Sequence, residues 1–402
     1  MREWFYDVFR ERPWWMSATL IFCAYMAFLY VPWDLLVMPV ARDEEVWFGI
    51  ELHGWLAKLA ALPHWFVYAA AIYGFRRRRP WMALWAPAYV AQIAFSIYVW
   101  KALETRGPTG LALGLVYALP MAGLAFAFWH SRHYFAPRPL GLVTRYGEWA
   151  LVTGASSGIG AELSRQIAAD GMNVVLSARR GDRLARLAGE IEKESGVATR
   201  VVVADLSERD GQDAVLAGVE DLEIGLLVNN AGLGYQGRFD LQDGERLRRL
   251  VAVNCEAPLV LTHALARRMC ARGRGAVLFT GSAAGHQPLP LHAVYAATKA
   301  FDRILGESLW GELRAANIDV AVLEPGSTQT EFQAIAGELA HPGDPVEIVA
   351  RTGLEALGQQ PSVLVGWYNW LRANLASRLL TRPVAIHAAH SLMAAQTPEE
   401  MR

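Results

Sequence analysis

Apolar residues are concentrated in the first third of the chain. Four stretches with few charges follow one another, at residues 14–40, 54–75, 81–100 and 111–129. Three of them meet the roughly 20 apolar residues that a helix needs to cross a bilayer, and the second is interrupted by Lys58, Pro63 and His64. Tryptophans cluster at the ends of the stretches, which is typical of side chains at a membrane interface. This pattern predicts an all-α, four-helix transmembrane domain over residues 1–135, with a soluble helical core as the alternative.

The pattern changes after a short linker at residues 136–146, where brief apolar runs begin to alternate with longer amphipathic ones. Strands are predicted at residues 149–153, 172–178, 199–205, 223–232 and 361–366. Two more are predicted to begin at residues 275 and 318. Helices are predicted between them, notably near residues 182–194, 245–272 and 293–316. Strands that alternate with helices indicate a parallel, doubly wound α/β sheet. We expect this domain to cover residues 147–366, with a helical tail at 367–402.

Basic residues are found on alternate connections between the four apolar stretches. They precede the first stretch, form the run of four arginines at residues 76–79, and follow the fourth stretch from Arg132 onward. With four spans these segments share one side of the membrane, and the positive-inside rule places that side in the cytoplasm. The sequence therefore predicts a multi-pass integral membrane protein whose α/β domain is cytoplasmic.

Polar groups in or near the apolar stretches are candidates for function, because burying such groups in a bilayer is costly. They are Asp34, Glu51, His53, His64 and Glu104, and the alternative is that each lies in water near a helix end. Asp34 in the first stretch and the segment VYALP at residues 116–120 in the last resemble the emopamil-binding-protein (EXPERA-like) type of membrane domain. That resemblance implies a domain that binds sterol-like lipids.

Composition excludes several classes of protein. The formal net charge over 402 residues is −1, so no general positive field favours nucleic acid as a partner. The three cysteines, Cys23, Cys255 and Cys270, are too few and too scattered for a disulfide framework or a zinc site. We therefore expect a reducing compartment and no metal.

A glycine-rich turn follows the first predicted strand of the α/β domain. The segment TGASSGIG at residues 153–160 places Gly154, Gly158 and Gly160 between a strand and an amphipathic helix. Glycines keep the turn open to a pyrophosphate, and the start of the helix supplies free N–H groups and the positive end of its dipole. With a strand before it and a helix after it, this pattern predicts a dinucleotide-binding Rossmann fold.

A second group of residues has the composition of a proton-transfer site. Tyr295 and Lys299 are four residues apart, so they share one face of a predicted helix. A nearby ammonium group favours the phenolate and should lower the tyrosine pKa, so that Tyr295 donates or accepts the proton in carbonyl–alcohol interconversion. Ser282 follows a strand, where its hydroxyl can bond the substrate oxygen. Each residue alone would more often be an ordinary surface or turn residue.

These segments together resemble the short-chain dehydrogenase/reductase family. The resemblance covers about residues 146–366 and includes TGASSGIG, NNAG at 229–232, VN at 253–254, Ser282, YAATK at 295–299 and PG at 325–326, in the family's order and spacing. It implies that Asn254 supports a water-linked proton relay to Lys299, which also holds the nicotinamide ribose. It further implies that the cofactor is held by Gly154, Ser156, Ser157, Gly158, Ile159, Gly160, Arg179, Arg180, Asp205, Leu206, Asn230, Ala231, Gly232, Tyr295, Lys299, Pro325, Gly326, Thr328 and Thr330.

The end of the second strand indicates which cofactor is used. An acidic residue there would bind the ribose 2′-hydroxyl of NAD, whereas arginine accommodates the 2′-phosphate of NADP. The strand ends in SARRGDR, so Arg179 and Arg180 favour NADP(H), with two solvated arginines as the alternative. Asp205 resembles the family's adenine contact, and Thr330 resembles its contact with the nicotinamide amide.

Apolar segments flank the predicted substrate site. The family resemblance implies that the segment after PG, with Phe332, Ile335 and Leu339, forms one wall of the substrate pocket and residues 285–291 the other. Both segments are apolar or neutral, which disfavours a small charged substrate. The tail places Trp370, Leu371 and Leu379 at helical spacing with intervening arginines. It is either a basic amphipathic helix on a membrane surface or a cover over the substrate cleft.

The sequence thus predicts a membrane-anchored NADP(H)-dependent oxidoreductase that interconverts a ketone and a secondary alcohol on a lipophilic substrate, sterol-like or long-chain. One alternative is a bifunctional protein whose membrane domain also isomerises or binds a sterol-like lipid, through Glu51, His53 or Glu104. Another is a lipid-binding or cofactor-sensing protein without catalysis. A homodimer through the long helices near residues 245–272 and 293–316 is also expected.

Overall fold

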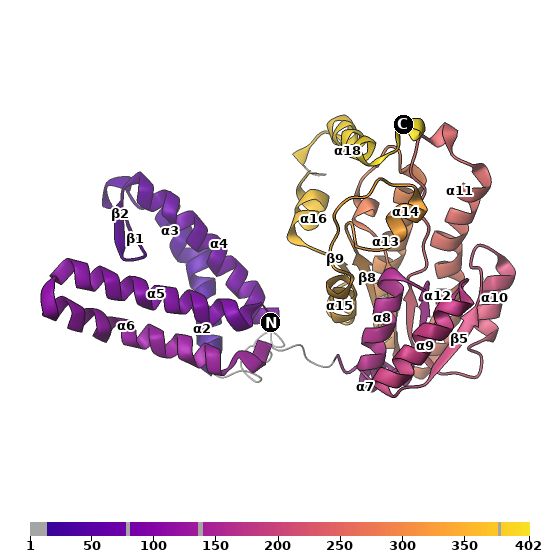
Figure 1. The fold of residues 1–402 in the computed structure, drawn as a ribbon, viewed down its shortest axis with the longest axis horizontal. Coiled ribbons are helices and arrows are strands. Elements are labelled where there is room, and N and C mark those ends of the chain that lie inside the picture. Colours follow the sequence, from indigo (N-terminus) through magenta and orange to yellow (C-terminus); the bar gives the residue numbers. More distant parts are fainter. Residues whose placement is uncertain (1–13, 78–80, 136–139, 377–378) are drawn as a thin grey trace. The chain divides into compact units, whose positions relative to one another are not determined.

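Four long apolar helices make up the first of two compact units, Met1–Arg138 and Pro139–Arg402 (Figure 1). The computed structural model describes residues 14–77, 81–135, 140–376 and 379–402. The first long helix consists of α2 (Trp14–Tyr25), a π-helical turn (Met26–Tyr30) and α3 (Val31–Leu36). The others are α4 (Trp55–Arg77), α5 (Met82–Thr105) and α6 (Gly107–His130). All four are long and apolar enough to cross a membrane; Arg78 and Arg79 of the arginine run lie outside the described residues.

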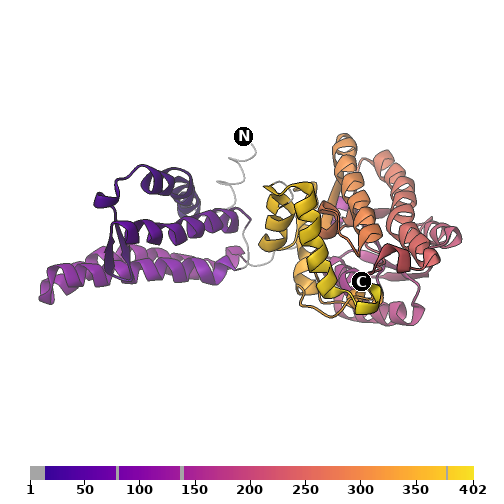
Figure 2. The same cartoon turned by 90° about the horizontal axis from the view of Figure 1, so that it is seen from above.

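Small residues allow α5 and α6 to run side by side (Figures 1 and 2). A Cβ atom at Gly114 would lie 2.7 Å from the carbonyl oxygen of Tyr98, and one at Gly110 would lie 3.0 Å from that of Ala102. Glycines four residues apart are typical of close helix contacts in membranes. Large side chains such as Phe66 and Leu119 are exposed on this unit, as expected for helices that face lipid.

A short antiparallel hairpin, β1 (Glu44–Trp47) and β2 (Ile50–His53), connects α3 to α4. It carries Glu51 and His53, both exposed, so these two candidates lie outside the apolar helices. Glu104 is exposed at the end of α5 and pairs with Lys101 at 2.5 Å. His64 lies within α4, where its ring stacks on Trp47 at 4.3 Å.

Asp34 is buried near the end of α3. Its carbonyl oxygen accepts a hydrogen bond from Lys58, whose Nζ also lies 3.0 Å from Oδ2 of Asp43. Lys58 and Asp43 are both buried. Of the candidates in this unit, Glu51, His53 and Glu104 are exposed, and the buried Lys58 is paired with Asp43.

A seven-stranded, fully parallel sheet forms the centre of the second unit, in the order β5-β4-β3-β6-β7-β8-β9. The strands are β3 (Trp149–Thr153), β4 (Asn173–Ala178), β5 (Thr199–Val203), β6 (Ile224–Asn229), β7 (Gly275–Thr280), β8 (Ile318–Glu324) and β9 (Ser362–Leu364). The strand order reverses between β3 and β6, which creates a crevice at the carboxyl ends of these strands, where doubly wound proteins bind ligands. The predicted α/β Rossmann fold preceded by four apolar helices is confirmed.

Helices cover both faces of the sheet (Figure 1). On one face lie α8 (Gly158–Ala169), α9 (Gly181–Ser195) and α15 (Val346–Ala356), which contribute Leu163, Leu187 and Leu354 to the core. On the other lie α10 (Arg209–Ala217), α12 (Ala257–Arg272) and α13 (Ala293–Leu313), which contribute Val215, Leu261 and Leu309. The strands are buried on both faces, and this explains why they appear in the sequence as continuous apolar runs. Other helices in the described part of the second unit are α7 (Leu142–Tyr146), α11 (Gly244–Val251), α14 (Phe332–Ala336), α16 (Trp367–Leu371) and α18 (Arg382–Gln396).

Candidate active site

The glycine turn after β3 is held in a form that only glycine permits. Gly154 has a φ of +66°, and a Cβ there would lie 2.8 Å from Cα of Ala231. A Cβ at Gly160 would lie 2.3 Å from Nδ2 of Asn230. Helix α8 begins at Gly158 without a side-chain cap, so its first N–H groups are available to an anion. The turn therefore fits the pyrophosphate of a dinucleotide.

The neighbouring strand end is fixed to this turn by Thr153. Its hydroxyl accepts hydrogen bonds from the backbone N–H groups of Asn230, at 3.0 Å, and Ala231, at 3.1 Å. Nδ2 of Asn230 in turn donates to the carbonyl oxygen of Thr153 at 3.0 Å. These bonds join the carboxyl ends of β3 and β6, so the segment NNAG forms one side of the crevice.

Arg180 reaches over the turn. Its guanidinium donates to Oγ of Ser157 at 2.7 Å and to Oγ of Ser156 at 3.0 Å, and it pairs with Glu331 at 2.8 Å. Hydrogen bonds from Arg180, and then from Arg183, lower the pKa of Glu331 to about 2. Arg179 lies 3.8 Å from Asp205, on the same side of the crevice. A cluster of basic groups therefore lies where the adenosine end of a dinucleotide would be bound.

Tyr295 and Lys299 lie together near the start of α13, and both are buried. Nζ of Lys299 donates to the carbonyl oxygen of Thr280 at 2.8 Å and to Oδ2 of Asp302 at 2.9 Å. Ser282 follows β7, and its hydroxyl accepts from the N–H of Ala284 at 3.1 Å. Asp302 was not identified from the sequence, although its position three residues after Lys299 on one helix face was available as a signal.

The electrostatics of Tyr295 differ from the sequence-based expectation. Burial raises its pKa above the ordinary value; the charge of Lys299 and a hydrogen bond with Ser282 lower it, but burial is the larger effect. The predicted influence of the lysine is present, but it does not bring the pKa below the usual range. The reason is that the phenol is almost completely removed from water, while the lysine is already paired with Asp302.

Asn254 lies in a π-helical turn, Ala252–Glu256, between α11 and α12. Its side chain accepts from the N–H of Leu233 at 2.8 Å and donates to the carbonyl oxygen of Leu233 at 2.9 Å and to Thr298 at 3.0 Å. A Cβ at Gly232 would lie 3.6 Å from both Oδ1 of Asn254 and Nζ of Lys299. The asparagine therefore lies close to the lysine and holds the loop after β6 in place.

One cavity of about 500 Å³ brings most of the predicted site residues together. Of the residues predicted for catalysis or cofactor binding, all line it except Asn254 and Gly160. Phe332 and Ile335 line its substrate side, as expected, together with Gln287 and Leu289; Leu339 does not. Thr330 contacts the glycine turn, since a Cβ at Gly158 would lie 3.0 Å from its methyl group.

The tail forms part of the same cavity. Leu392, Met393 and Gln396 of α18 line it, as do Asn369 of α16 and Arg372 of the turn after it. Met393 and Ala389 pack on Leu289 and Leu291, which belong to the opposite wall. The tail therefore lies over the cleft, which is one of the two alternatives predicted for it from the sequence.

Three polar residues that line the substrate side of the cavity were not predicted from the sequence as site residues, namely His292, Glu338 and His341. His292 lies three residues before Tyr295, a spacing that could have drawn attention to it. Glu338 and His341 follow the short helix α14, and their sequence positions gave no such signal.

The second unit combines a doubly wound parallel sheet with a glycine turn that fits a pyrophosphate and with a buried tyrosine–lysine pair in the same cavity. This combination defines an oxidoreductase that uses a nicotinamide cofactor and acts on CH–OH groups. The profile of the short chain dehydrogenase family matches residues 148–338. The chain belongs to this family.

Several proteins resemble the second unit. A very-long-chain 3-oxoacyl-CoA reductase from Anas platyrhynchos is 34% identical over 233 residues, which is 55% of this chain and 74% of the relative. A 7beta-hydroxysteroid dehydrogenase from Collinsella aerofaciens is 34% identical over 237 residues, 57% of this chain and 90% of the relative. Among solved structures, a 7beta-hydroxysteroid dehydrogenase has a TM-score of 0.58 at 31% identity, covering 62% of this chain and 98% of its own. A short-chain dehydrogenase from Sphingobium yanoikuyae in complex with NADPH has a TM-score of 0.52 at 33% identity. The match covers 58% of this chain and 96% of that structure's chain.

Proposed function

We propose that this protein is a membrane-anchored, NADP(H)-dependent reductase that interconverts a ketone and a secondary alcohol on a lipophilic substrate. The observation that carries the proposal is the single cavity that joins the glycine turn to Tyr295, Ser282 and a largely apolar wall. Relatives named for very-long-chain 3-oxoacyl-CoA and for hydroxysteroids support a lipid or sterol-like substrate. The NADPH complex of the Sphingobium enzyme and the position of Arg180 support NADP(H).

The residues of the cavity have separate roles in this proposal. The nicotinamide cofactor, when bound, supplies or accepts a hydride. Ser282 donates a hydrogen bond to the substrate oxygen as negative charge develops there, and Tyr295 gives that oxygen its proton. Lys299 favours the phenolate that remains. Asn254 keeps the loop after β6 in position and, in the proposed proton relay, supports the water that reaches Lys299.

Turnover by the full chain in detergent tests this function. NADPH and NADH oxidation would be measured with steroid ketones, 3-oxoacyl thioesters and small aromatic ketones. We expect NADPH-dependent turnover of one lipophilic class at a kcat/KM well above that for the small ketones. Tight NADPH binding without turnover of any ketone would contradict the proposal and favour the cofactor-sensing alternative.

Arg180→Ala should weaken NADPH binding about 10- to 100-fold and change NADH binding little, because a charge-assisted hydrogen bond to the 2′-phosphate is lost. Arg183→Ala is the matched control, since Arg183 also pairs with Glu331 but does not line the cavity. Dissociation constants would be measured by calorimetry. Equal losses for both cofactors would show that Arg180 supports the turn rather than the 2′-phosphate.

The proposed topology places the ends of α6 on opposite sides of the membrane. With the second unit in the cytoplasm, Ser131→Cys should react with an impermeant thiol reagent only after the cells are permeabilised. Thr105→Cys should react in intact cells. Labelling with the opposite pattern would reverse the orientation, and labelling of both in intact cells would exclude a span at α6.

Two further expectations stay proposals. The bifunctional alternative rests on Glu51, His53 and Glu104, all of which are exposed in the described part of the chain. The homodimer is supported by large apolar side chains exposed on the long helices, namely Val251, Leu259, Phe301 and Ile304.

A further inference from the structure

A buried histidine lies directly against the tyrosine to which we assign proton transfer. The ring of His292 stacks on the ring of Tyr295, with centroids 4.5 Å apart and an interplanar angle of 21°. Its side chain is only 6% exposed, yet the residue lines the cavity. Among the described residues, its Nε2 atom has no hydrogen-bond partner.

An unpaired buried nitrogen is unusual, because most buried polar atoms are hydrogen-bonded and leaving one unpaired is costly. The lining of this cavity includes the apolar residues Leu289, Phe332, Leu392 and Met393, together with the polar residues Glu338 and His341. A ligand that enters this side of the cavity therefore meets an unpaired buried nitrogen next to the reacting group.

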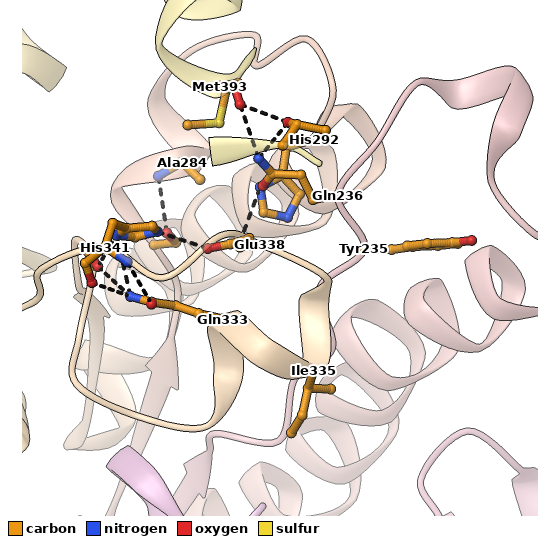
Figure 3. Close-up of polar contacts among 12 residues, drawn as sticks. Tyr235, Gln236, Ala284, His292, Gln333, Ile335, Glu338, His341 and Met393 are labelled. Carbon is orange, nitrogen blue, oxygen red and sulfur yellow. Dashed lines mark hydrogen bonds and ion pairs between the residues drawn. The ribbon is translucent and has the colours of Figure 1, made fainter. Parts of the chain in front are cut away.

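The other ring nitrogen of His292 faces a carboxyl group. Nδ1 lies 3.9 Å from Oε1 of Glu338, whose side chain is 8% exposed. Oε2 of Glu338 contacts Nε2 of His341 at 3.1 Å, and Nδ1 of His341 contacts Oγ of Ser327 at 2.9 Å (Figure 3). Gln333 donates to the carbonyl oxygen of His341 at 3.1 Å. This network fixes the carboxyl group opposite His292.

The carboxyl group that faces Nδ1 favours one hydrogen-bonding role for Nε2. Burial lowers the pKa of His292 to about 4, so the imidazole is neutral near pH 7 and carries one N–H group. An accepting oxygen opposite Nδ1 favours the hydrogen on Nδ1. Nε2 is then an acceptor, and its partner must donate.

We infer that His292, oriented by Glu338, is a specificity-determining residue whose Nε2 accepts a hydrogen bond from a hydroxyl group of the substrate. Because the His292 and Tyr295 rings are stacked, that hydroxyl lies within a few carbon atoms of the reacting carbonyl. The inference rests on the proposed reductase function and narrows its substrate class to a hydroxylated lipophilic ketone. A 3-oxoacyl thioester has only accepting oxygens near its ketone and fits this atom less well.

The test compares a steroid ketone that carries a hydroxyl near the carbonyl with its deoxy analogue, for several ring positions. With the full chain in detergent, we expect kcat/KM to favour the hydroxylated ketone of at least one pair by about 10- to 100-fold. His292→Leu should lose most of that preference, and His292→Gln, which retains an accepting oxygen, should recover part of it. His390→Leu, the same substitution at an exposed position of α18, should keep the preference.

Binding gives a readout that does not depend on turnover. The NADPH-loaded Tyr295→Phe protein would be titrated with both ketones by calorimetry, with and without His292→Leu. A preference for the hydroxylated ketone that His292→Leu removes supports the inference even if the proposed reduction is not observed. Three results would overturn it: no pair with a preference, a preference unchanged in His292→Leu, or equal losses for both ketones, which would make His292 only a support for Tyr295.

Discussion

Tyr295→Phe is expected to lower kcat about 10²- to 10⁴-fold while leaving NADPH affinity unchanged. The substitution removes only the hydroxyl group. The ring packs against His292, with centroids 4.5 Å apart, and against Phe332 at 5.4 Å, and phenylalanine can keep both contacts. The loss should therefore fall on proton transfer rather than on the fold or on cofactor binding.

Tyr235→Phe is the matched control for this experiment. Tyr235 is another tyrosine of the second unit, but its hydroxyl accepts a hydrogen bond from the N–H of Asp243 and the residue does not line the cavity (Figure 3). Its kcat should stay close to that of the unmodified chain. If Tyr295→Phe turned over the same ketone at a similar rate, another group would have to supply the proton, and the assignment of Tyr295 would be wrong.

Asp302→Ala is expected to lower the free energy of unfolding of the second unit by about 3–5 kcal/mol. The substitution leaves the ammonium group of Lys299 buried, with the carbonyl oxygen of Thr280 as its described hydrogen-bond partner. An uncompensated buried charge costs more than the ion pair contributes. Hydrogen exchange of the amides in β6 and β7, which lie at the centre of the sheet, would report the change.

Removing both charges separates stability from activity. The double variant Asp302→Leu with Lys299→Met should recover much of the lost stability, because no unpaired charge remains, yet it should stay inactive. A single Asp302→Ala variant as stable as the unmodified chain would mean that water or a shifted lysine compensates the charge. The ion pair would then have no structural role.

Spacing along the chain was enough to predict most of the cofactor side of the cavity. Gly154, Gly158 and Gly160 lie on one turn, and Tyr295 and Lys299 lie on one helix, so local geometry brings each group together whatever the rest of the chain does. The apolar runs of the sheet were equally clear, since strands buried on both faces contain few polar residues. Their alternation with helices then required a parallel order.

The substrate side was not predictable in this way. His292 and Glu338 are 46 positions apart and meet only because the segment after α14 folds back over the start of α13. The hairpin between α3 and α4 was missed because its strands are short and lie next to a dominant apolar pattern. It places the candidates Glu51 and His53 on strand β2, outside the apolar helices.

The sequence by itself determined the four apolar helices, the doubly wound sheet, the glycine turn and the tyrosine–lysine pair, because each follows from a periodicity or a spacing of a few residues. Only the tertiary structure decided that the tail covers the cavity, that Asp302 neutralises Lys299, and that burial outweighs the lysine at Tyr295. These features depend on how completely water is excluded when distant segments pack together. A local sequence pattern does not specify this exclusion of water.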